Sequence, residues 1–421
     1  MEFVTRDTMS QAYRHSAEMG LIDSNDTLVI FMDLSILEDR IERLKQSFGS
    51  NTLHAIAIKT NPMSFVLKHL ADMQVGLEAA SFGEVCLAEN AGLMSERLVF
   101  DSPAKTEWEI AELRSRFRGA RVNADSIDEL NRYPTVASGL RIGLRINPLV
   151  QTNTISYMSV SDEHSKFGES IVQRSEIIDA CNQWQDLDCL HLHIGSQVTN
   201  LNRTVDAVRK ILELGQEIND RAGKRKISTI DIGGGFPVNY GLGDPFRVEE
   251  YAFALSERCP ELFDGRFNLI TEFGRYVHAN ACWAVANIEY VKPIPGSFNL
   301  ITHAGADLFL RECYNPGDWF HKIFLLDRNG FEKYGEDQKV NIAGPLCFGG
   351  DFVERNIEIP KATPGDHIVF CDVGANTFSL WSKHCSRQFP KVITFNSRNG
   401  LNDFRIGKQR ETFDSIIDFW S

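Results

Sequence analysis

The stretches CLHLHIGSQ (residues 189–197) and TIDIGGGFP (residues 229–237) decide the fold that we expect for this chain. Each begins as a short apolar run and ends in polar or glycine-rich positions, and a long amphipathic segment lies between them. A buried strand that is followed by a helix produces this pattern. The two stretches therefore predict consecutive strand–helix units around a parallel sheet.

Six more runs of the same kind flank this pair. In chain order the eight runs are HAIAIK from His54, VGLEAA from Val75, RLVFD from Arg97, ARVNA from Ala120, RIGLRIN from Arg141, CLHLHIG from Cys189, TIDIGG from Thr229 and NLITEFG from Asn268. Eight such units predict an α/β fold of the (β/α)8 TIM-barrel type, in which active sites form at the carboxyl ends of the strands. Polar or glycine positions lie at the ends of these runs, so we expect a functional site there.

The sequence pattern changes after about residue 281. Runs such as IEYVKPI, FNLITHA and KVITF are short, alternate in polarity, and are separated by Pro, Gly, Asn and Asp. This pattern predicts an antiparallel β domain, to which the stretch TLVIFM near Thr27 is expected to return as a strand. The expected parts are an N-terminal segment of the β domain (1–35), the barrel (36–281) and a C-terminal β domain (282–421).

Composition and charge argue against several classes of function. Of the 421 residues, 43% are hydrophobic and 24% are charged, which is typical of a globular chain. The net charge of −13 is spread along the sequence and argues against a general nucleic-acid or anionic-membrane surface. The charged start and the lack of a long apolar run predict a cytoplasmic enzyme. Nine scattered cysteines without CxxC spacing predict neither a disulfide framework nor a zinc site.

Two motifs at predicted strand ends carry candidate chemistry. IAIKTNP places Lys59 at the end of an apolar strand, where burial can lower the pKa of a lysine and favour an imine with an aldehyde cofactor. An ordinary strand-end lysine is the alternative. DIGGGFP places Gly233, Gly234 and Gly235 directly after the seventh strand, where backbone N–H groups can wrap a phosphate. A tight turn is the alternative for this motif.

HLHIGSQ and TEFGR add further candidates. HLHIGSQ places His191 and His193 at alternate positions, and such a pair taken alone would more often be structural or metal-binding. Gly195 and Ser196 follow immediately and suggest a loop that faces a ligand. TEFGR supplies Glu272, and a carboxylate there can hold a pyridine nitrogen protonated so that the ring accepts electrons.

Taken in order, the motifs resemble those of the fold type III (alanine-racemase-fold) pyridoxal-phosphate enzymes, and within them the diaminopimelate, ornithine and arginine decarboxylase branch. The ordered elements are AIKTNP, SFGE, RVNADSIDEL, LRINP, SKFG, HLHIGSQ, DIGGGFP, EFGR, GPLC and DVGA. The resemblance covers nearly the whole chain. It implies pyridoxal 5'-phosphate as the cofactor, no metal ion, α-decarboxylation of a small amino-acid substrate, and a homodimer with shared active sites.

The resemblance also implies roles for individual residues. Lys59 would form the imine with the cofactor, His193 would stack on its ring, and Glu272 would bind the pyridine nitrogen. Cys347 in GPLC corresponds to a cysteine that the neighbouring subunit contributes, a candidate proton donor to the carbanion left when carbon dioxide departs. Lys59, His193 and Cys347 are thus the expected catalytic residues. The other expected cofactor-binding residues are Glu78, Ser196, Gly233, Gly234, Gly235, Arg275 and Asn376.

Two positions depart from the family pattern and bear on the substrate. Asn376 replaces the tyrosine of GAY, which touches the cofactor phosphate. Phe348 stands where the family has a carboxylate for the distal ammonium group of the substrate, and an apolar ring cannot neutralise an ammonium. Arg311 in DLFLREC resembles the arginine that diaminopimelate decarboxylases use for the distal carboxylate. Asp351 could instead take over an ammonium contact.

These departures predict a diaminopimelate-like substrate, or a carboxylated or acylated diamine with an acidic distal end, as in siderophore or antibiotic biosynthesis. An amino-acid racemase of the same fold is one alternative, but such racemases generally use a tyrosine from the partner subunit, whereas this chain has GPLC. A regulatory homologue without catalysis is the other alternative. Retention of Lys59, His193, the glycine triplet, Glu272 and Cys347 argues against it.

Overall fold

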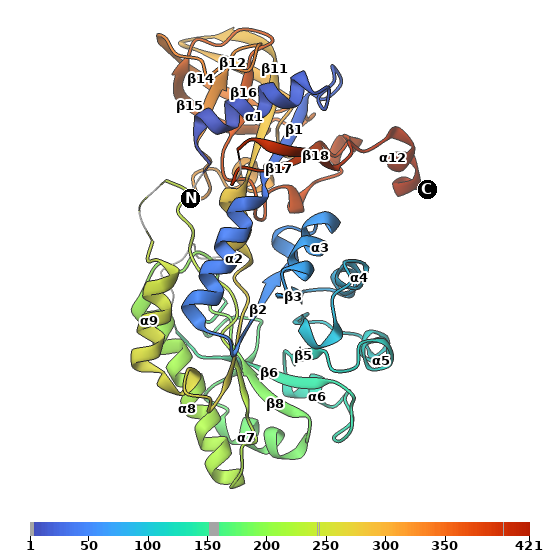
Figure 1. Ribbon diagram of the computed structural model, residues 1–421, viewed down its shortest axis with the longest axis vertical. Coiled ribbons are helices and arrows are strands. Elements are labelled where there is room, and N and C mark those ends of the chain that lie inside the picture. The colour runs from blue at the N-terminus through green and yellow to red at the C-terminus, as the bar shows by residue number, and fades with distance from the viewer. Residues whose placement is uncertain (1–3, 151–159, 242, 244, 399) are drawn as a thin grey trace. The chain divides into compact units, whose positions relative to one another are not determined.

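The structure is a computed structural model that describes residues 4–150, 160–241, 243, 245–398 and 400–421 (Figure 1). The chain forms two compact units. The barrel unit comprises Ile41–Asn239 and Asp244–Tyr276, and the β unit comprises Met1–Arg40, Tyr240–Gly243 and Val277–Ser421. The predicted domain limits, near residues 35 and 281, stay a prediction.

The barrel unit contains a closed ring of eight parallel strands. Their order is β5-β4-β3-β2-β10-β9-β8-β6, and the pairing of β5 with β6 closes the ring. The strands are β2 (Thr52–Ala57), β3 (Gly76–Ala79), β4 (Leu98–Phe100), β5 (Arg121–Ala124), β6 (Arg141–Asn147), β8 (Leu187–His191), β9 (Thr229–Asp231) and β10 (Asn268–Thr271), with the two-residue β7 (Glu169–Ser170) beside β6. All eight predicted runs form these strands, so the TIM-barrel prediction is confirmed.

Helices lie around the outside of the barrel strands (Figure 1). The strands are almost entirely buried because helices cover the outer face and side chains fill the interior, which explains why the runs read as nearly continuous apolar sequence. The helices are α2 (Leu34–Phe48), α3 (Ser64–Asp72), α4 (Phe82–Asn90), α5 (Glu107–Arg116), α6 (Ile127–Leu130), α7 (Arg174–Gln183), α8 (Leu201–Ala222), α9 (Val248–Arg258) and α10 (Gly274–His278).

The β unit is built on a curled sheet whose core contains stacked aromatic rings. Trp283 lies 5.3 Å from Phe31 and 5.6 Å from Phe395 between ring centroids, and all three rings are buried. Its elements are α1 (Arg6–Glu18), β1 (Leu28–Asp33), β11 (Cys282–Ile294), β12 (Ser297–Thr302), α11 (Leu310–Tyr314), β13 (Ile323–Leu326), β14 (Asp337–Ala343), β15 (Phe352–Pro360), β16 (His367–Phe370), β17 (Lys391–Asn396), β18 (Asn402–Lys408) and α12 (Phe413–Trp420).

The β domain predicted after residue 281 is present, and its sheet is mixed rather than antiparallel throughout. Strand β1 does join this sheet as predicted, pairing antiparallel with β11 but parallel with β17, and β12 pairs parallel with β14. Parallel neighbours need long crossovers, and the chain between β12 and β14 supplies one that includes α11 and β13. Alternation of polar and apolar residues does not reveal the direction of such pairings. Within the described residues, no helix has the length and hydropathy needed to cross a bilayer.

Candidate active site

The predicted cofactor lysine lies at the carboxyl end of the barrel. Lys59 sits in the 3-10 turn η1 (Ile58–Thr60) directly after β2, and its Nζ donates to Glu78 Oε2 on β3 at 2.5 Å. The Glu78 side chain is 1% exposed, whereas the Lys59 side chain is 45% exposed. The amine is therefore accessible at the mouth of the barrel, while its counter-ion is buried beneath it.

The ionisation of Lys59 differs from the sequence expectation. Desolvation alone would lower the pKa of Lys59, but the surrounding carboxylates of Glu78, Glu272 and Asp101 outweigh this effect and raise its pKa above the ordinary value. The prediction that burial lowers the pKa of Lys59 is therefore wrong. A neutral Lys59 amine requires that a neighbouring group accept its proton.

The glycine triplet follows β9 in a backbone conformation that excludes side chains. Gly233 has φ +63°, and a Cβ there would lie 2.2 Å from the Leu192 carbonyl oxygen. The Gly233 N–H donates to Asp231 Oδ1 and the Gly234 N–H donates to His193 Nδ1, each at 2.9 Å. These two donors are therefore used within the barrel, and the phosphate contact of the triplet stays a prediction.

The hydrogen bond from Gly234 fixes the state of His193, which lies just beyond β8. Because His193 Nδ1 accepts this hydrogen bond, that nitrogen carries no proton. Desolvation, together with the charges of Arg145 and Lys59, holds the pKa of His193 well below its ordinary value. His193 is thus a neutral ring in a fixed orientation, which suits the predicted stacking role and argues against proton transfer through Nδ1.

Two of the predicted phosphate ligands contact each other. Arg275 Nε on α10 donates to Ser196 Oγ at 3.2 Å, and the arginine is 7% exposed. A guanidinium and a hydroxyl held side by side form a site for an anion, since both can donate to phosphate oxygens. The structure thus brings together residues that are 79 positions apart in the sequence.

Glu272 lies in a buried acidic cluster under the barrel mouth. One potential ligand atom from each of Asp101, His191, Asp231 and Glu272 lies within 4.8 Å of the others. His191 Nε2 is 3.7 Å from Asp101 Oδ2 and 3.8 Å from Glu272 Oε1. This spacing could also hold a metal ion, so the sequence expectation that no metal is needed stays a prediction.

The cluster favours one shared proton between Asp101 and Glu272. Burial, reinforced by the charges of Asp101 and Asp231, raises the pKa of Glu272 well above its ordinary range. Burial alone would also raise the pKa of Asp101, but the nearby His191, Lys59 and Lys105 help to lower it to about 2. Two buried carboxyl groups at this separation cannot both ionise, so Glu272 keeps the proton.

The residues at the barrel mouth fit pyridoxal phosphate. A bound pyridine nitrogen would require a protonated or ionic partner, and among the described residues the buried Glu272 Oε1 has no hydrogen-bond partner and would be available for that role. The Lys59 amine, the Ser196–Arg275 pair and the glycine turn supply the nucleophile and the anion site. The donor set therefore contains groups that would suit the aldehyde, the phosphate and the ring nitrogen of the cofactor.

The predicted site residues do not include Asp101, His191 and Asp231, although HLHIGSQ had marked His191 as a structural or metal-binding candidate. Asp101 follows β4, while His191 and Asp231 are the last residues of β8 and β9. Their position at strand ends is the signal that identified the other site residues, and it could have identified these three. Only the closed barrel shows that they point into one interior space.

The raised pKa of Asp231 is expected to make the stability of the protein depend on pH. Burial and the nearby Asp101 charge raise the pKa of Asp231 from 3.8 to about 7. The folded state therefore holds a proton that the unfolded chain loses near pH 3.8, so the free energy of unfolding falls as pH rises between these values, by at most about 1.4 kcal/mol per pH unit per proton. Asp231→Asn is expected to flatten this slope in urea titrations of the cofactor-free protein.

Asn123 makes this substitution tolerable, because its Nδ2 donates to Asp231 Oδ2 at 3.2 Å and its amide can rotate to face the new donor. The control is Asp220→Asn, which changes an exposed aspartate on α8 and should leave the slope as in the wild type. Equal slopes for Asp231→Asn and the wild type would contradict the raised pKa.

The residues predicted from GPLC and DVGA belong to the β unit. Cys347 is exposed, and the half-buried Phe348 stacks on Tyr314 with ring centroids 5.0 Å apart. The guanidinium of Arg311 lies 4.7 Å from the centre of the Trp319 ring. Asn376 has φ +55°, a conformation that asparagine adopts more readily than most residues.

Asp351 does not present a free carboxylate. It is 3% exposed, and its two oxygens accept hydrogen bonds from the Ala306 and Leu346 N–H groups, each at 2.6 Å. A carboxylate that already binds two backbone amides has little capacity for a substrate. This geometry argues against the predicted contact between Asp351 and a substrate ammonium group.

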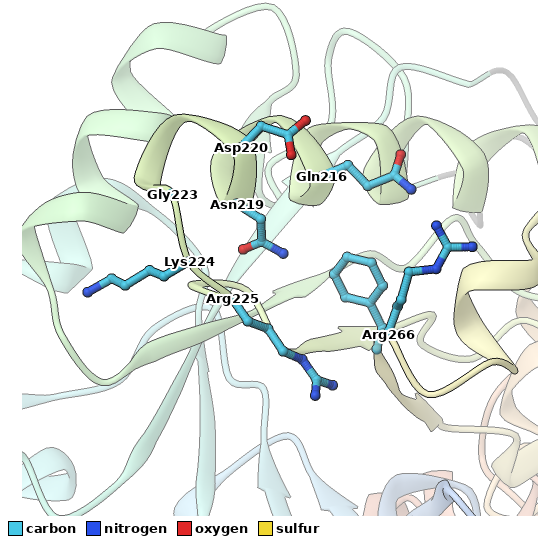
Figure 2. Close-up of a pocket in the computed structure, with 8 residues that line it drawn as sticks. Gln216, Asn219, Asp220, Gly223, Lys224, Arg225 and Arg266 are labelled. Carbon is cyan, nitrogen blue, oxygen red and sulfur yellow. The ribbon is translucent and has the colours of Figure 1, made fainter.

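A cavity of about 700 Å³ lies away from this chemistry (Figure 2). Its basic lining residues come just before β9 and β10, and hence lie at the amino ends of the barrel strands. Arg266 in its wall is already paired with Asp264 at 2.6 Å. The cavity contains none of the predicted site residues. It is lined by Gln216, Asn219, Asp220, Gly223, Lys224, Arg225, Arg266 and Phe267.

Comparison with known proteins identifies the family. Residues 34–279 match the family model described as pyridoxal-dependent decarboxylase, pyridoxal binding domain. The chain is similar to the diaminopimelate decarboxylase of Aquifex aeolicus, with 27% identity over 91% of this chain and 89% of the relative. It is also similar to that of Haemophilus influenzae, with 30% identity over 83% of this chain and 84% of the relative.

The fold agrees with these sequence matches. A crystal structure of diaminopimelate decarboxylase from Helicobacter pylori, complexed with L-lysine, superposes with a TM-score of 0.84 at 24% identity, covering 96% of this chain and 98% of that one. This likeness bears on the fold, while the family model and the sequence relatives bear on the chemistry. The chain therefore belongs to the pyridoxal-dependent decarboxylases, in the fold type III branch of the diaminopimelate, ornithine and arginine decarboxylases, and its cofactor is pyridoxal 5'-phosphate.

Proposed function

We propose that this carboxy-lyase removes the α-carboxylate of a diaminopimelate-like amino acid, with diaminopimelate as the first candidate. The observation that carries the proposal is the arrangement at the barrel mouth, where the Lys59 amine, the buried Glu272 and the Ser196–Arg275 pair gather at the carboxyl ends of the strands. The bound cofactor supplies the electron sink for decarboxylation. The curated relatives named above favour diaminopimelate over siderophore or antibiotic intermediates.

The proton of Lys59 has a defined acceptor. Lys59 must lose a proton before its nitrogen can act as a nucleophile, and Glu78 Oε2 lies 2.5 Å from that nitrogen. Burial raises the pKa of Glu78 despite the adjacent lysine, so Glu78 is able to hold the transferred proton. We therefore assign Glu78 the role of exchanging a proton with Lys59 Nζ when the amine is bound and released.

We propose that residues of the β unit recognise the distal end of the substrate. Arg311 can pair with a distal carboxylate, as two N–H groups of a guanidinium match two carboxylate oxygens. Phe348, stacked on Tyr314, offers no charge to a distal ammonium group. A substrate whose distal amine is acylated would remove that conflict, and it remains the second candidate.

A substrate panel tests this proposal. Carbon dioxide release would be measured for diaminopimelate, ornithine, lysine and acylated diamino acids with the wild type, Phe348→Glu and Phe348→Leu. Release from diaminopimelate by the wild type supports the first candidate, and Phe348→Glu is then expected to improve use of substrates with a free distal ammonium by up to about fivefold, equivalent to the roughly 1 kcal/mol of one exposed charge pair. Phe348→Leu keeps the site apolar and should not give this gain.

Two results of the panel would count against parts of the proposal. A wild type that strongly prefers unmodified diaminopimelate, with no gain from Phe348→Glu, would contradict the role given to Phe348 while leaving the decarboxylase intact. Inversion of the α carbon without gas release would favour a racemase instead.

We also propose a homodimer in which Cys347 of one subunit completes the site of the other. Mixing inactive Lys59→Ala and Cys347→Ala subunits should restore up to about a quarter of wild-type activity, because half of the dimers are mixed and each mixed dimer has one intact site. The mixture is formed by unfolding and refolding the two variants together. A mixture that stays inactive, although sedimentation shows dimers, would contradict a shared site.

A further inference from the structure

We propose that Asp351 is a positioning residue that holds the loop of residues 344–351, and with it Cys347 and Phe348, in the conformation that the reaction uses. The importance of this loop for catalysis rests on the proposed function, which gives Cys347 a proton-transfer role and Phe348 a role in substrate choice. The conformation of the loop itself is argued from contacts within the β unit.

The loop folds back on itself around the Asp351 side chain. The Gly344 N–H donates to the Asp351 carbonyl at 2.9 Å, and the Asp351 N–H donates to the Phe348 carbonyl at 3.0 Å. Asp351 Oδ2 accepts the Leu346 N–H at 2.6 Å from inside the loop. Cys347 thus lies between two residues whose backbone groups are held by this network.

The same carboxylate joins the loop to a second segment. Asp351 Oδ1 accepts the N–H of Ala306 at 2.6 Å, and Ala306 lies shortly before α11, the helix that carries Arg311 and Tyr314. The stacking of Phe348 on Tyr314 is a second link between the two segments. One buried carboxylate therefore sets the separation between the proposed proton donor and the proposed specificity residues.

Two glycines make room for the Asp351 carboxylate. A Cβ at position 305 would lie 2.3 Å from Asp351 Oδ1, and a Cβ at position 344 would lie 2.3 Å from Oδ2. A side chain at position 305 would require the carboxylate to move, and one at position 344 would also meet the Cα of Gly305 at 2.4 Å. The combination of Gly305, Gly344 and Asp351 is therefore one structural unit, although its members are up to 46 positions apart.

The test is amide hydrogen exchange of the holoenzyme with Asp351→Asn. The Ala306 and Leu346 N–H groups donate to different oxygens of Asp351, and asparagine replaces one of these oxygens with an NH2 donor, so one of the two N–H groups loses its acceptor. Exchange in the peptide spanning the loop is expected to accelerate about tenfold or more, because a charge-assisted hydrogen bond is lost. We expect kcat to fall about tenfold or more while bound cofactor and its visible absorption stay as in the wild type.

Asp327→Asn is the matched control, because Asp327 Oδ1 also accepts two backbone N–H groups, from Asn329 at 2.8 Å and Phe331 at 3.0 Å, in another turn of the β unit. It should leave exchange in the 344–351 loop unchanged. Asp351→Asn protein with wild-type exchange in this loop would overturn the proposal. So would exchange that accelerates across the whole β unit together with loss of cofactor, since that result indicates a general loss of stability.

A second measurement tests the glycine contact directly. Gly305→Ala is expected to accelerate exchange in the loop of the wild type but to add less than about twofold in the Asp351→Ala background, where the clashing oxygens are gone. Equal effects in both backgrounds would overturn the proposed coupling. If no panel substrate is decarboxylated, the proposed function fails, whereas the exchange results still decide the role of Asp351 in the loop.

Discussion

Lys59→Ala is expected to lower the rate of carbon dioxide release by at least about a thousandfold and to remove the visible absorption of the holoenzyme. The amine of Lys59, beside Glu78 at the barrel mouth, is the proposed nucleophile, and alanine leaves no nitrogen that can bond to the cofactor aldehyde. The measurement combines an absorption spectrum after incubation with pyridoxal phosphate and a gas-release assay.

Two control variants distinguish the loss of the Lys59 amine from the loss of its positive charge. Lys59→Arg keeps a cation near Glu78 but provides no amine for an imine, so it should be as inactive as alanine. Lys68→Ala removes an exposed lysine on α3 and should retain both absorption and activity. A Lys59→Ala protein that keeps the wild-type visible band would refute the central assignment.

Glu272→Gln is expected to lower kcat by about a hundredfold or more while the cofactor remains bound. The substitution keeps the size of the side chain and its hydrogen-bonding capacity, but it removes the acid that shares a proton with Asp101 and can protonate a pyridine nitrogen. The measurement is kcat at saturating substrate, together with cofactor content.

Glu272→Ala is the comparator for this prediction. It removes the contact altogether and should lose cofactor affinity as well as kcat, since the buried side chain would be replaced by empty space. Glu272→Gln protein that turns over at the wild-type rate would show that the proton on Glu272 has no part in the reaction.

The barrel could be predicted from the sequence because its strands are specified locally. Each parallel strand is buried on both faces and reads as a short apolar run, and polar residues such as Lys59, His193 and Glu272 follow the runs. Strands that close into a ring place their carboxyl ends together, so the order of the runs alone predicted that these residues share one site.

The pairing of distant strands and the pKa shifts of buried groups could not be predicted from such local sequence patterns. The mixed sheet of the β unit depends on crossovers between distant strands, and the raised pKa of Lys59 depends on three carboxylates from other strands. The hydrogen bonds of Asp351 could not be predicted for a related reason, because its backbone partners include Ala306, which is 45 positions away. Such contacts leave no local pattern in the sequence.

The sequence by itself determined the barrel and the family motifs and predicted a cofactor lysine, because these depend on periodic burial and on residue types at strand ends. Only the tertiary structure decided which groups share protons and which are held by backbone amides. Protonation and hydrogen-bond partners depend on distances of a few ångströms between segments far apart in the chain, as between Asp101 and Glu272. Folding sets those distances.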